Sequence, residues 1–588
     1  MRHQSSLPLL VLAFVPLLGS HAAAQWSSDA SENLLAVDRA GEQTQPKLAP
    51  TADGGFYLGW FDNDPDGSPA FGYDVYLQRF DSAGNEQWAH DGVLVADLGL
   101  SSTTDWDLDT DAAGNALLTF QDDRGTGVQI TAAKVDASGS ALWGASGIQL
   151  TNTAAFVANP KIAGTTDGDA VVAWVQDNTA HLQRLDAAGA AQWTEIVLTP
   201  GAGSYAPNDL DTTESGTCIL SFTHQTGGFG SPRHILAQKY DSAGTAAWGA
   251  HVPVFDGGSL QFGNFPQFEP DGAGGAVFAW YAVSPLECYA QRLDADGAEL
   301  FPHDGVALST DATRLRVSPA VAFDADTQST YVVAVQTNSL QSQFGVVAQK
   351  LDATGARQWG VNGVTLVALG TAATAETECL VVGSRIAATW TSAPSFGQDV
   401  ARVALLDPAG ALALPIFPLS STAAVKYRFQ AANSSFGHGI WAWRDERDAD
   451  AHVYLQDLLP SGLLGGLAST ASRNGSNVNV VCYTAVSDAR LGTSWTTSIS
   501  HAHHPGATST VIQGRTTAIS GPVLTYGQVL IAGPRIFQHA QAATGSADVH
   551  ALPVPVDLTL VGVTLRTQAL ILGGGLELGN ALDITLGL

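Results

Sequence analysis

The segment DNDPDGSPAFGYD carries alternating aspartates of a kind that can bind a cation. Asp62, Asp64 and Asp66 precede a glycine in a D-x-D-x-D-G array. Calcium binds several oxygen ligands at about 2.3 to 2.6 Å, and a glycine permits the tight bend that turns alternate carboxylates inward. Tyr73 stands where the usual bidentate acid would be, and Asp74 follows it. We therefore name Asp62, Asp64, Asp66 and Asp74 as candidate Ca2+ ligands, with a solvated acidic loop as the favoured alternative.

A second acidic row, TDWDLDTD, spaces its aspartates two residues apart. The row and its match in the fourth repeat comprise Asp105, Asp107, Asp109 and Asp111, with Asp209 and Asp211. In a strand this spacing places alternate residues on one face of the sheet. Stacked like charges are destabilising unless water or a cation screens them. The row predicts a solvated face, with the lining of a central channel as one location and a functional site as the less favoured reading.

Three histidines, His501, His503 and His504, lie close together in SHAHHPG. Imidazoles two residues apart can share a strand face and bind a transition metal. No cysteine or acid nearby in the sequence completes a ligand shell, which favours a plain loop cluster.

No G-x-S-x-G, H-E-x-x-H, P-loop or dinucleotide motif is present, so no catalytic residue is indicated.

A repeated turn, D-x-x-G-x-x-x-W, shows which elements must position these side chains. It returns about every 50 to 58 residues, a period typical of stacked sheet modules. The aspartate is expected to accept backbone N–H groups, the glycine to adopt positive φ, and the indole to wedge between modules. The turn residues are Asp81, Gly84 and Trp88; Asp136, Gly139 and Trp143; Asp186, Gly189 and Trp193; Asp241, Gly244 and Trp248; and Asp352, Gly355 and Trp359, while Phe301 replaces the tryptophan of the fifth copy.

The repeats predict an all-β fold with almost no helix. The turn glycine and a second column of large apolar residues each occur eight times. A module of about four short strands leaves both faces uncovered, so modules pack in a ring or a stack. We predict an eight-bladed β-propeller over residues 25–465, in which NLLAVD at 33–38 completes the last blade. A seven-bladed ring with one irregular unit is the alternative.

The two ends of the chain differ from the repeats. Residues 1–24 read as a signal peptide, with Arg2 before an apolar run and a small-residue cleavage site. Residues 466–588 are rich in Ser, Thr and Gly and have balanced charge, and their short strands predict a β-sandwich-like C-terminal domain.

The formal net charge of -29 lies in the repeats and disfavours nucleic acid and anionic lipid as partners. The four cysteines are read as buried thiols, with a disulfide as the minority case.

Two parts of the chain resemble known groups of proteins. The segments WRDERDADAHVYLQ, FQDDRGTGVQITAAKVD and YDVYLQRFDSAGNEQW resemble the W-x-D-x-R and DIYAQRLDxxGxxxW repeats of secreted bacterial β-propeller proteins of uncharacterised function. The tail, with HALPVPVDLTLVGVTLRTQAL, resembles a C-terminal domain of exported planctomycete-like proteins. The turn is also similar to the tryptophan-docking turn of quinoprotein dehydrogenases, which is one residue longer and comes with cysteine and quinone contacts that have no match here. These resemblances imply a propeller and a reused tail, and no catalytic residue.

The sequence therefore favours a secreted or cell-surface binding or scaffold protein without enzymatic activity. Its C-terminal domain would serve attachment, sorting or assembly, and an extracellular protein or glycan would be the partner. No apolar stretch after the signal reaches the length of about 20 residues that crosses a bilayer. The alternative is an extracellular enzyme, either a glycan hydrolase or lyase or a quinoprotein-like oxidoreductase. A hydrolase would require carboxylates that converge across the channel.

Overall fold

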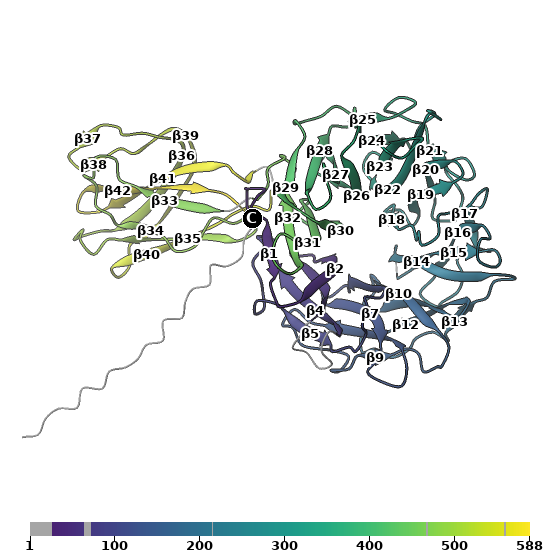
Figure 1. Ribbon diagram of the computed structural model, residues 1–588. Helices are drawn as coiled ribbons and strands as arrows, with labels where there is room; N and C mark the ends of the chain where they lie inside the picture. The colour runs from purple at the N-terminus through teal and green to yellow at the C-terminus, as the bar shows by residue number, and fades with distance from the viewer. Residues whose placement is uncertain (1–25, 64–71, 215, 466–467, 558–559, 588) are drawn as a thin grey trace, which may run out of the picture.

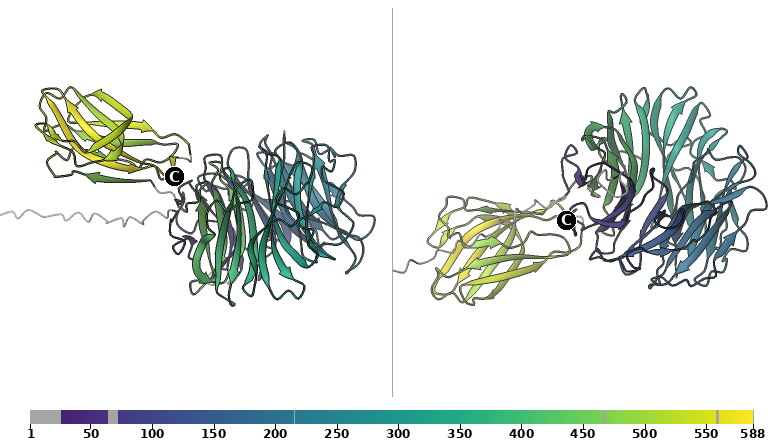
Figure 2. Two further views of the ribbon diagram at one scale, coloured as in Figure 1. Left: turned by 90° about the horizontal axis from the view of Figure 1, so that it is seen from above. Right: turned by 60° about the horizontal axis from the view of Figure 1, so that its bottom comes forward.

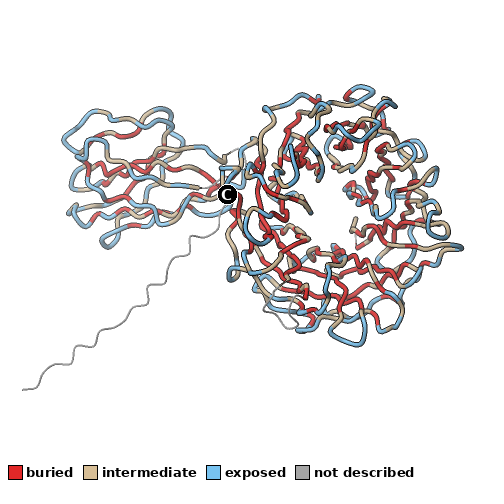
Figure 3. The backbone as a smooth tube through the Cα atoms, viewed as in Figure 1, coloured by how far each residue is buried: buried red, intermediate tan, exposed pale blue. Residues whose placement is uncertain are grey.

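The structure is a computed structural model that describes residues 26–63, 72–214, 216–465, 468–557 and 560–587. Within these ranges the regular elements are all β-strands and no α-helix is present, which confirms the all-β prediction. The strands of residues 34–458 form a ring, and the later strands form a separate group beside it (Figures 1 and 2). Buried residues concentrate in the strands and exposed residues in the connections (Figure 3).

The ring consists of four-stranded antiparallel sheets, eight of them among the described residues. We number the sheets in chain order and their strands from the centre outward. Sheets one to four are β2 (Glu42–Pro50), β3 (Phe56–Asn63), β4 (Tyr73–Phe80), β5 (Val93–Ala96); β6 (Trp106–Thr110), β7 (Ala116–Asp122), β8 (Gln129–Val135), β9 (Ile148–Gln149); β10 (Val157–Gly164), β11 (Ala170–Gln176), β12 (Thr179–Leu185), β13 (Ile196–Leu198); and β14 (Ser204–Thr212), β15 (Cys218–Gln225), β16 (Arg233–Tyr240), β17 (Val252–Phe255). Sheets five to eight are β18 (Phe268–Pro270), β19 (Ala276–Val283), β20 (Leu286–Leu293), β21 (Val306–Ala307); β22 (Arg314–Asp324), β23 (Ser329–Asn338), β24 (Phe344–Leu351), β25 (Val364–Gly370); β26 (Ala373–Val382), β27 (Arg385–Ala393), β28 (Asp399–Leu406), β29 (Phe417–Ala424); and β30 (Lys426–Asn433), β31 (Gly439–Asp445), β32 (His452–Leu458), β1 (Leu34–Val37).

This arrangement is a β-propeller, and its last sheet joins the two ends of the repeat region. β1 pairs with β32 through Leu34 opposite Leu455 and Leu35 opposite Tyr454, so the N-terminal segment supplies the outermost strand of the eighth sheet. The innermost strands β2 and β30 are also in contact. A closed ring leaves no long free sheet edge.

The repeated turn links each sheet to the next. In the second sheet, Asp136 accepts the backbone N–H groups of Ser138 and Ser140 at 2.8 and 2.9 Å. Gly139 has φ +85°, and a Cβ on it would lie 3.3 Å from the indole of Trp88. That indole donates its N–H to the carbonyl of Ala137 at 3.0 Å. The glycine is therefore required both by its backbone angle and by the indole of the preceding sheet.

The same indole bond recurs around the ring. Trp143, Trp193, Trp248 and Trp359 donate to the carbonyls of Ala187, Ser242, Ala295 and Pro408 at 3.0 to 3.2 Å. Phe301 makes the packing contact alone, against Gly355. The eighth repeat has no tryptophan of its own, and Trp26 takes the place by donating to Ser82 at 2.9 Å and packing on Gly84.

Antiparallel order divides the connections between two ends of the ring. The connections from second to third strands, and from one sheet to the next, share one end, which we call the loop face. The connections from first to second and from third to fourth strands, including the repeated turns, share the other end, the turn face. β32 is a third strand, so the chain leaves the ring at the turn face. Arg490 of the C-terminal part lies 3.9 Å from Asp81 of the first repeated turn.

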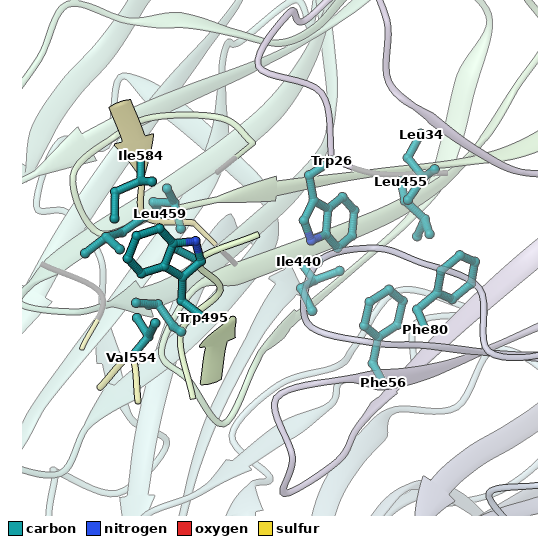
Figure 4. Packing of buried hydrophobic residues seen from close by; sticks show 14 of the residues in the cluster. Trp26, Leu34, Phe56, Phe80, Ile440, Leu455, Leu459, Trp495, Val554 and Ile584 are labelled. Carbon is teal, nitrogen blue, oxygen red and sulfur yellow. The ribbon is translucent and has the colours of Figure 1, made fainter. Parts of the chain in front are cut away.

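The C-terminal part contains two main sheets with a common core. The strands are β33 (Ser469–Arg473), β42 (Leu576–Thr585), β41 (Thr564–Leu572), β36 (Ser509–Ala518) and β39 (Ile531–Ala542) in one sheet, β34 (Tyr483–Ala485), β35 (Ser494–Ser500) and β40 (Ala547–Pro553) in the other, and β37 (Val523–Leu524) with β38 (Gly527–Gln528) as a ribbon. Trp495 of one sheet and Ile584 of the other belong to one buried cluster with Leu459 and Trp26 of the ring (Figure 4). The four cysteines are all unpaired and buried, as the favoured reading of the sequence predicted.

Candidate functional site

Aspartates and glutamates of the innermost strands line the centre of the ring. Most innermost strands carry a β-bulge, after which one side chain faces the centre. The residues that follow the bulge, with the corresponding residues of β6 and β18, are Lys47, Asp107, Lys161, Asp209, Glu269, Ala320, Glu378 and Gln430. Two adjoining cavities of about 210 and 390 Å3 are lined by seven of these residues. The larger cavity contains Glu269 and Glu378, and the smaller contains Asp107, Asp109, Asp209 and Asp211.

The second and fourth repeats therefore bring their acids together, with one correction. Asp107 and Asp109 face the smaller cavity together with Asp209 and Asp211. Asp105 lies before β6 and is exposed. The prediction of four aspartates on one strand face therefore holds for Asp107 and Asp109 alone, because β6 spans Trp106–Thr110; Asp111 caps the turn that follows. There its carboxylate is buried and lies 2.6 Å from Nζ of Lys134.

The inner carboxylates hold neighbouring sheets together. Asp107 accepts the backbone N–H of Ile162 at 3.1 Å, and Asp109 accepts that of Gly164 at 2.7 Å. Asp209 accepts the N–H of Phe268 at 3.0 Å. An innermost strand has no further strand beyond it, so its inward N–H groups need other acceptors. These aspartates are thus structural acceptors between sheets, and Asp107 also pairs with Lys47 at 3.2 Å.

Burial within the ring raises the pKa values of the inner acids. It raises the pKa of Asp109 and that of Asp209 to about 6, and repulsion by Asp107 acts in the same direction. Burial, with repulsion from Asp209, raises the pKa of Glu269 to about 7. Burial also raises the pKa of Glu378 to about 8, with further repulsion from other glutamates. Glu269 is exposed toward the centre of the ring and Glu378 is half-buried, and in both the surrounding protein disfavours the charged form of the carboxyl.

The raised pKa of Glu378 predicts a stability that falls as pH rises. A carboxyl whose pKa moves from 4.5 to about 8 on folding contributes stability that is full below pH 4.5 and is lost as pH rises through 8. The variant Glu378→Gln does not ionise. From pH 5 to pH 8 we expect the free energy of unfolding of the native protein to fall by about 2 kcal/mol relative to that of the variant. This is less than 1.36 kcal/mol per pKa unit because Glu378 is only half-buried and solvent screens its charge.

The measurement is urea unfolding at both pH values, with the exposed Glu32→Gln as control. Equal pH slopes for Glu378→Gln and the native protein would contradict this account of the channel acids.

Exposed aromatic side chains lie at one side of the larger cavity on the loop face. Phe262 and Phe265 lie in the connection between β17 and β18 and line the cavity. Phe229, between β15 and β16, packs edge-on against Phe262 with centroids 5.4 Å apart. The guanidinium of Arg233 lies 4.7 Å from the Phe262 ring centroid. We call Phe229, Phe262 and Phe265 the aromatic rim.

The predicted calcium ligands are only partly described. Asp64 and Asp66 lie outside the described residues. Asp62 is fully buried, its Oδ2 3.3 Å from Nε of Arg39, and Asp74 accepts the N–H of Leu98 at 2.7 Å. Asp62 and Asp74 are opposite each other in the pairing of β3 with β4. Both carboxylates thus serve structural contacts, and the calcium site stays a prediction.

The histidine cluster acquires an acid from a distant strand. His503 and His504 lie 2.9 and 2.6 Å from the two carboxylate oxygens of Glu577, in β42. His501 turns away from them, 3.4 Å from Asp548. The sequence places Glu577 more than 70 residues from these histidines, so only the sheet pairing reveals the contact.

Two further features were not identified from the sequence. One is the aromatic rim, because exposure of a phenylalanine depends on how its connection folds. The other is a pair of histidine and aspartate clusters, Asp38, His90 and Asp91, and Asp256, His303 and Asp304. Their signal was present as E-x-[WF]-x-H-D-G at residues 86–92 and 299–305.

No protein-family model matches the chain. No curated protein matches it either. Among solved structures, the chain is similar to a puromycin hydrolase at 14% identity and TM-score 0.38, covering 72% of this chain and 61% of that one. It is similar to prolyl oligopeptidase B from Galerina marginata at 12% identity and TM-score 0.37, covering 70% and 56%. It is also similar to a periplasmic gluconolactonase from Pseudomonas aeruginosa at 15% identity and TM-score 0.36, covering 59% and 96%.

The chain thus spans less than two thirds of the puromycin hydrolase and of the oligopeptidase. At these identities and TM-scores the neighbours say nothing about its activity or ligand. Within the described residues, no helix has the length and apolarity needed to cross a membrane.

Proposed function

We propose that this chain is a secreted or cell-surface binding protein without enzymatic activity, and that its loop face binds a glycan. The proposal comprises a signal peptide at 1–24, an eight-bladed propeller over 25–465 and a sandwich-like domain over 466–588 for attachment, sorting or assembly. It is supported by the eight four-stranded sheets, by the two C-terminal sheets with a shared core, and by the resemblance of the repeats to secreted propeller proteins.

The aromatic rim is the observation that carries the proposal. Phe229, Phe262 and Phe265 are 86, 63 and 42% exposed, although burying each ring would be favourable. Grouped apolar side chains on a folded surface mark binding sites more often than single ones do. Flat rings can stack on the C–H faces of sugar rings and lose little conformational entropy when they do.

The wall below the rim supplies the polar contacts that sugar hydroxyls require. Glu269 and Glu378 line the same cavity of about 390 Å3 as Phe262 and Phe265. The pKa of each of these carboxyls is raised, and a protonated carboxyl both donates and accepts hydrogen bonds, which matches a hydroxyl group. Gln267 and Thr377 also line this cavity, so an apolar rim stands above a polar wall, and such convergent polar groups fix the orientation of a bound small ligand. A protein partner would favour a flatter surface.

The C-terminal part leaves this site accessible. The chain departs from the ring at the turn face, and its sheets lie beside the ring (Figure 2). Arg490 approaches the first repeated turn, at the opposite end from the rim. Attachment through residues 466–588 would therefore present the loop face outward.

A glycan hydrolase is the second candidate, favoured by one observation. Asp109 and Asp209 face the same small cavity, and burial raises the pKa of each to about 6, within the range of a general acid. A glycan hydrolase requires two carboxylates that converge on the substrate, and Asp109 and Asp209 are a pair that faces one cavity here. Their hydrogen bonds to Gly164 and Phe268 favour the structural role.

The binding proposal is tested with a panel of oligosaccharides and isothermal titration. For a glycan that binds, we expect Phe229→Ala with Phe262→Ala to weaken affinity at least about tenfold, as for anchor residues of an interface. Phe396→Ala is the matched control, because Phe396 is 97% exposed on the loop face of another sheet. Equal affinity of the rim variant and the native protein, or binding only to proteins, would contradict the proposal.

A further inference from the structure

Two clusters of the same four side chains lie at two junctions between sheets. In the first, His90 Nδ1 lies 2.8 Å from Glu86 Oε1, and His90 Nε2 lies 3.2 Å from Asp38 Oδ1 and 3.8 Å from Asp91 Oδ1. In the second, His303 Nδ1 lies 3.0 Å from Glu299 Oε1. His303 Nε2 lies 3.1 Å from Asp256 Oδ1 and 3.9 Å from Asp304 Oδ1.

The two clusters occupy equivalent places. Asp38 and Asp256 each follow the outermost strand of one sheet, β1 or β17. The histidine, its glutamate and the second aspartate belong to the connection before β5 or β21 in the next sheet. β5 and β21 lie on opposite sides of the ring (Figure 1). The first cluster joins the N-terminal segment to the first sheet.

We propose that each cluster is a zinc-binding site, formed by Asp38, His90 and Asp91 at one junction and by Asp256, His303 and Asp304 at the other. Two ligand atoms about 2.0 to 2.1 Å from a tetrahedral zinc ion lie about 3.3 Å apart. The separations from Nε2 to Asp38 and to Asp256 are 3.2 and 3.1 Å. All three ligand atoms of each cluster lie within 4.8 Å of one another, so small side-chain shifts complete the site, with water as the fourth ligand.

The glutamate supports this reading of each histidine. A metal-bound imidazole usually gives its other N–H to a carboxylate, which fixes the tautomer and the ring orientation. Glu86 and Glu299 stand at Nδ1 of His90 and His303. That arrangement directs the Nε2 lone pair at the two aspartates, where a divalent cation would relieve the repulsion between them.

A third junction shows what the backbone alone requires. Asp304 accepts the N–H groups of Asp256 and Gly257 at 2.9 Å each. At the junction of the fifth and sixth sheets, Asn362 takes the same place and accepts the N–H of Thr310 at 3.2 Å. A neutral amide without histidine is therefore sufficient to cap the neighbouring strand. Capping the backbone therefore does not require the carboxylate, the histidine and the glutamate that the other two junctions contain.

The alternative is a protonated histidine that bridges carboxylates without a metal. The hydrogen bonds that His303 donates to Glu299 and Asp256 raise the pKa of His303. Burial acts to lower the pKa of His90, but its hydrogen bond to Glu86 and the nearby acids outweigh burial and raise that pKa. This alternative also predicts that the junctions weaken when a histidine is replaced. Stability alone therefore does not distinguish the two, and metal binding must be measured directly.

The experiment titrates Zn2+ into the chelator-treated full chain by calorimetry, with Co2+ absorption as a second readout. We expect two equivalents, one in His90→Asn or His303→Asn and none in the double variant. Glu86→Gln should weaken one site about tenfold or more, and saturating Zn2+ should raise Tm by about 2 to 5 °C in the native protein and not in the double variant.

His504→Ala is the control for the cluster around Glu577 and should leave both equivalents. Zinc binding that the double variant retains, or the absence of saturable zinc binding to the native chain, would overturn the proposal. A loss of stability in the histidine variants without zinc binding would assign the clusters as ion pairs only.

Discussion

Trp26→Ala is expected to lower the free energy of unfolding of the ring by about 3 to 5 kcal/mol, the usual cost of removing a fully buried tryptophan. Trp26 is 0% exposed and stacks on Phe56 with centroids 5.8 Å apart. It also takes the place of the indole that the eighth repeat lacks, through its bond to Ser82. Its loss opens a cavity where the two ends of the repeat region meet.

Trp26→Phe is the matched variant, because the fifth repeat uses Phe301 at this place without an indole bond. We expect this change to cost about 1 to 2 kcal/mol, from one lost hydrogen bond and a smaller ring. Chemical denaturation followed by circular dichroism measures both values. If Trp26→Ala stays within 1 kcal/mol of the native protein, Trp26 does not serve ring closure.

The second large effect is expected from Asp445→Ala in the eighth sheet. The Asp445 carboxylate is fully buried, and its Oδ2 lies 2.7 Å from Lys426 Nζ, 2.8 Å from Trp443 Nε1 and 2.6 Å from an Arg447 nitrogen. Burial acts to raise the pKa of Asp445, and the contacts with Arg447 and Lys426 outweigh it and hold the pKa below its ordinary value. Removing the carboxylate leaves a buried ammonium, so we expect a loss of about 3 to 5 kcal/mol.

Two comparisons isolate the buried charge as the cause. Asp122→Ala changes the corresponding residue of the second sheet, whose partner Arg124 is 27% exposed, and should cost no more than about 2 kcal/mol. Asp445→Leu combined with Lys426→Met removes both charges and should recover most of the stability that Asp445→Ala loses. Equal losses for Asp122→Ala and Asp445→Ala would show that the loss comes from the shared motif.

The fold was predictable because its determinants are local and repeated. Each D-x-x-G-x-x-x-W turn shows its aspartate, its glycine and its indole within eight residues. The pairing of β1 with β32 followed from the likeness of NLLAVD at 33–38 to GVLVAD at 92–97. The role of Trp26 did not follow, because it lies outside any copy of the turn and acts through Ser82 across the sheet junction.

The candidate site was less predictable, since it depends on contacts between sheets. The alternation of aspartates correctly placed Asp107 and Asp109 on one face of a strand. It does not indicate where the strand ends, and so the prediction for Asp111 was wrong. The contact of Glu577 with His503 and His504 arises from the pairing of strands far apart in the sequence. Whether Phe229 and Phe262 are exposed depends on the paths of two connections, which no short pattern specifies.

The most direct test of the binding account follows one glycan through both binding and turnover. A labelled oligosaccharide that binds in the titration is incubated with the native protein, and the bound material is then recovered and its length measured by mass spectrometry. The account predicts saturable binding that depends on Phe262 and recovery of the intact glycan after prolonged incubation. Shortened products that form with the native protein and disappear in Asp109→Asn or Asp209→Asn would contradict it and assign the channel acids to hydrolysis.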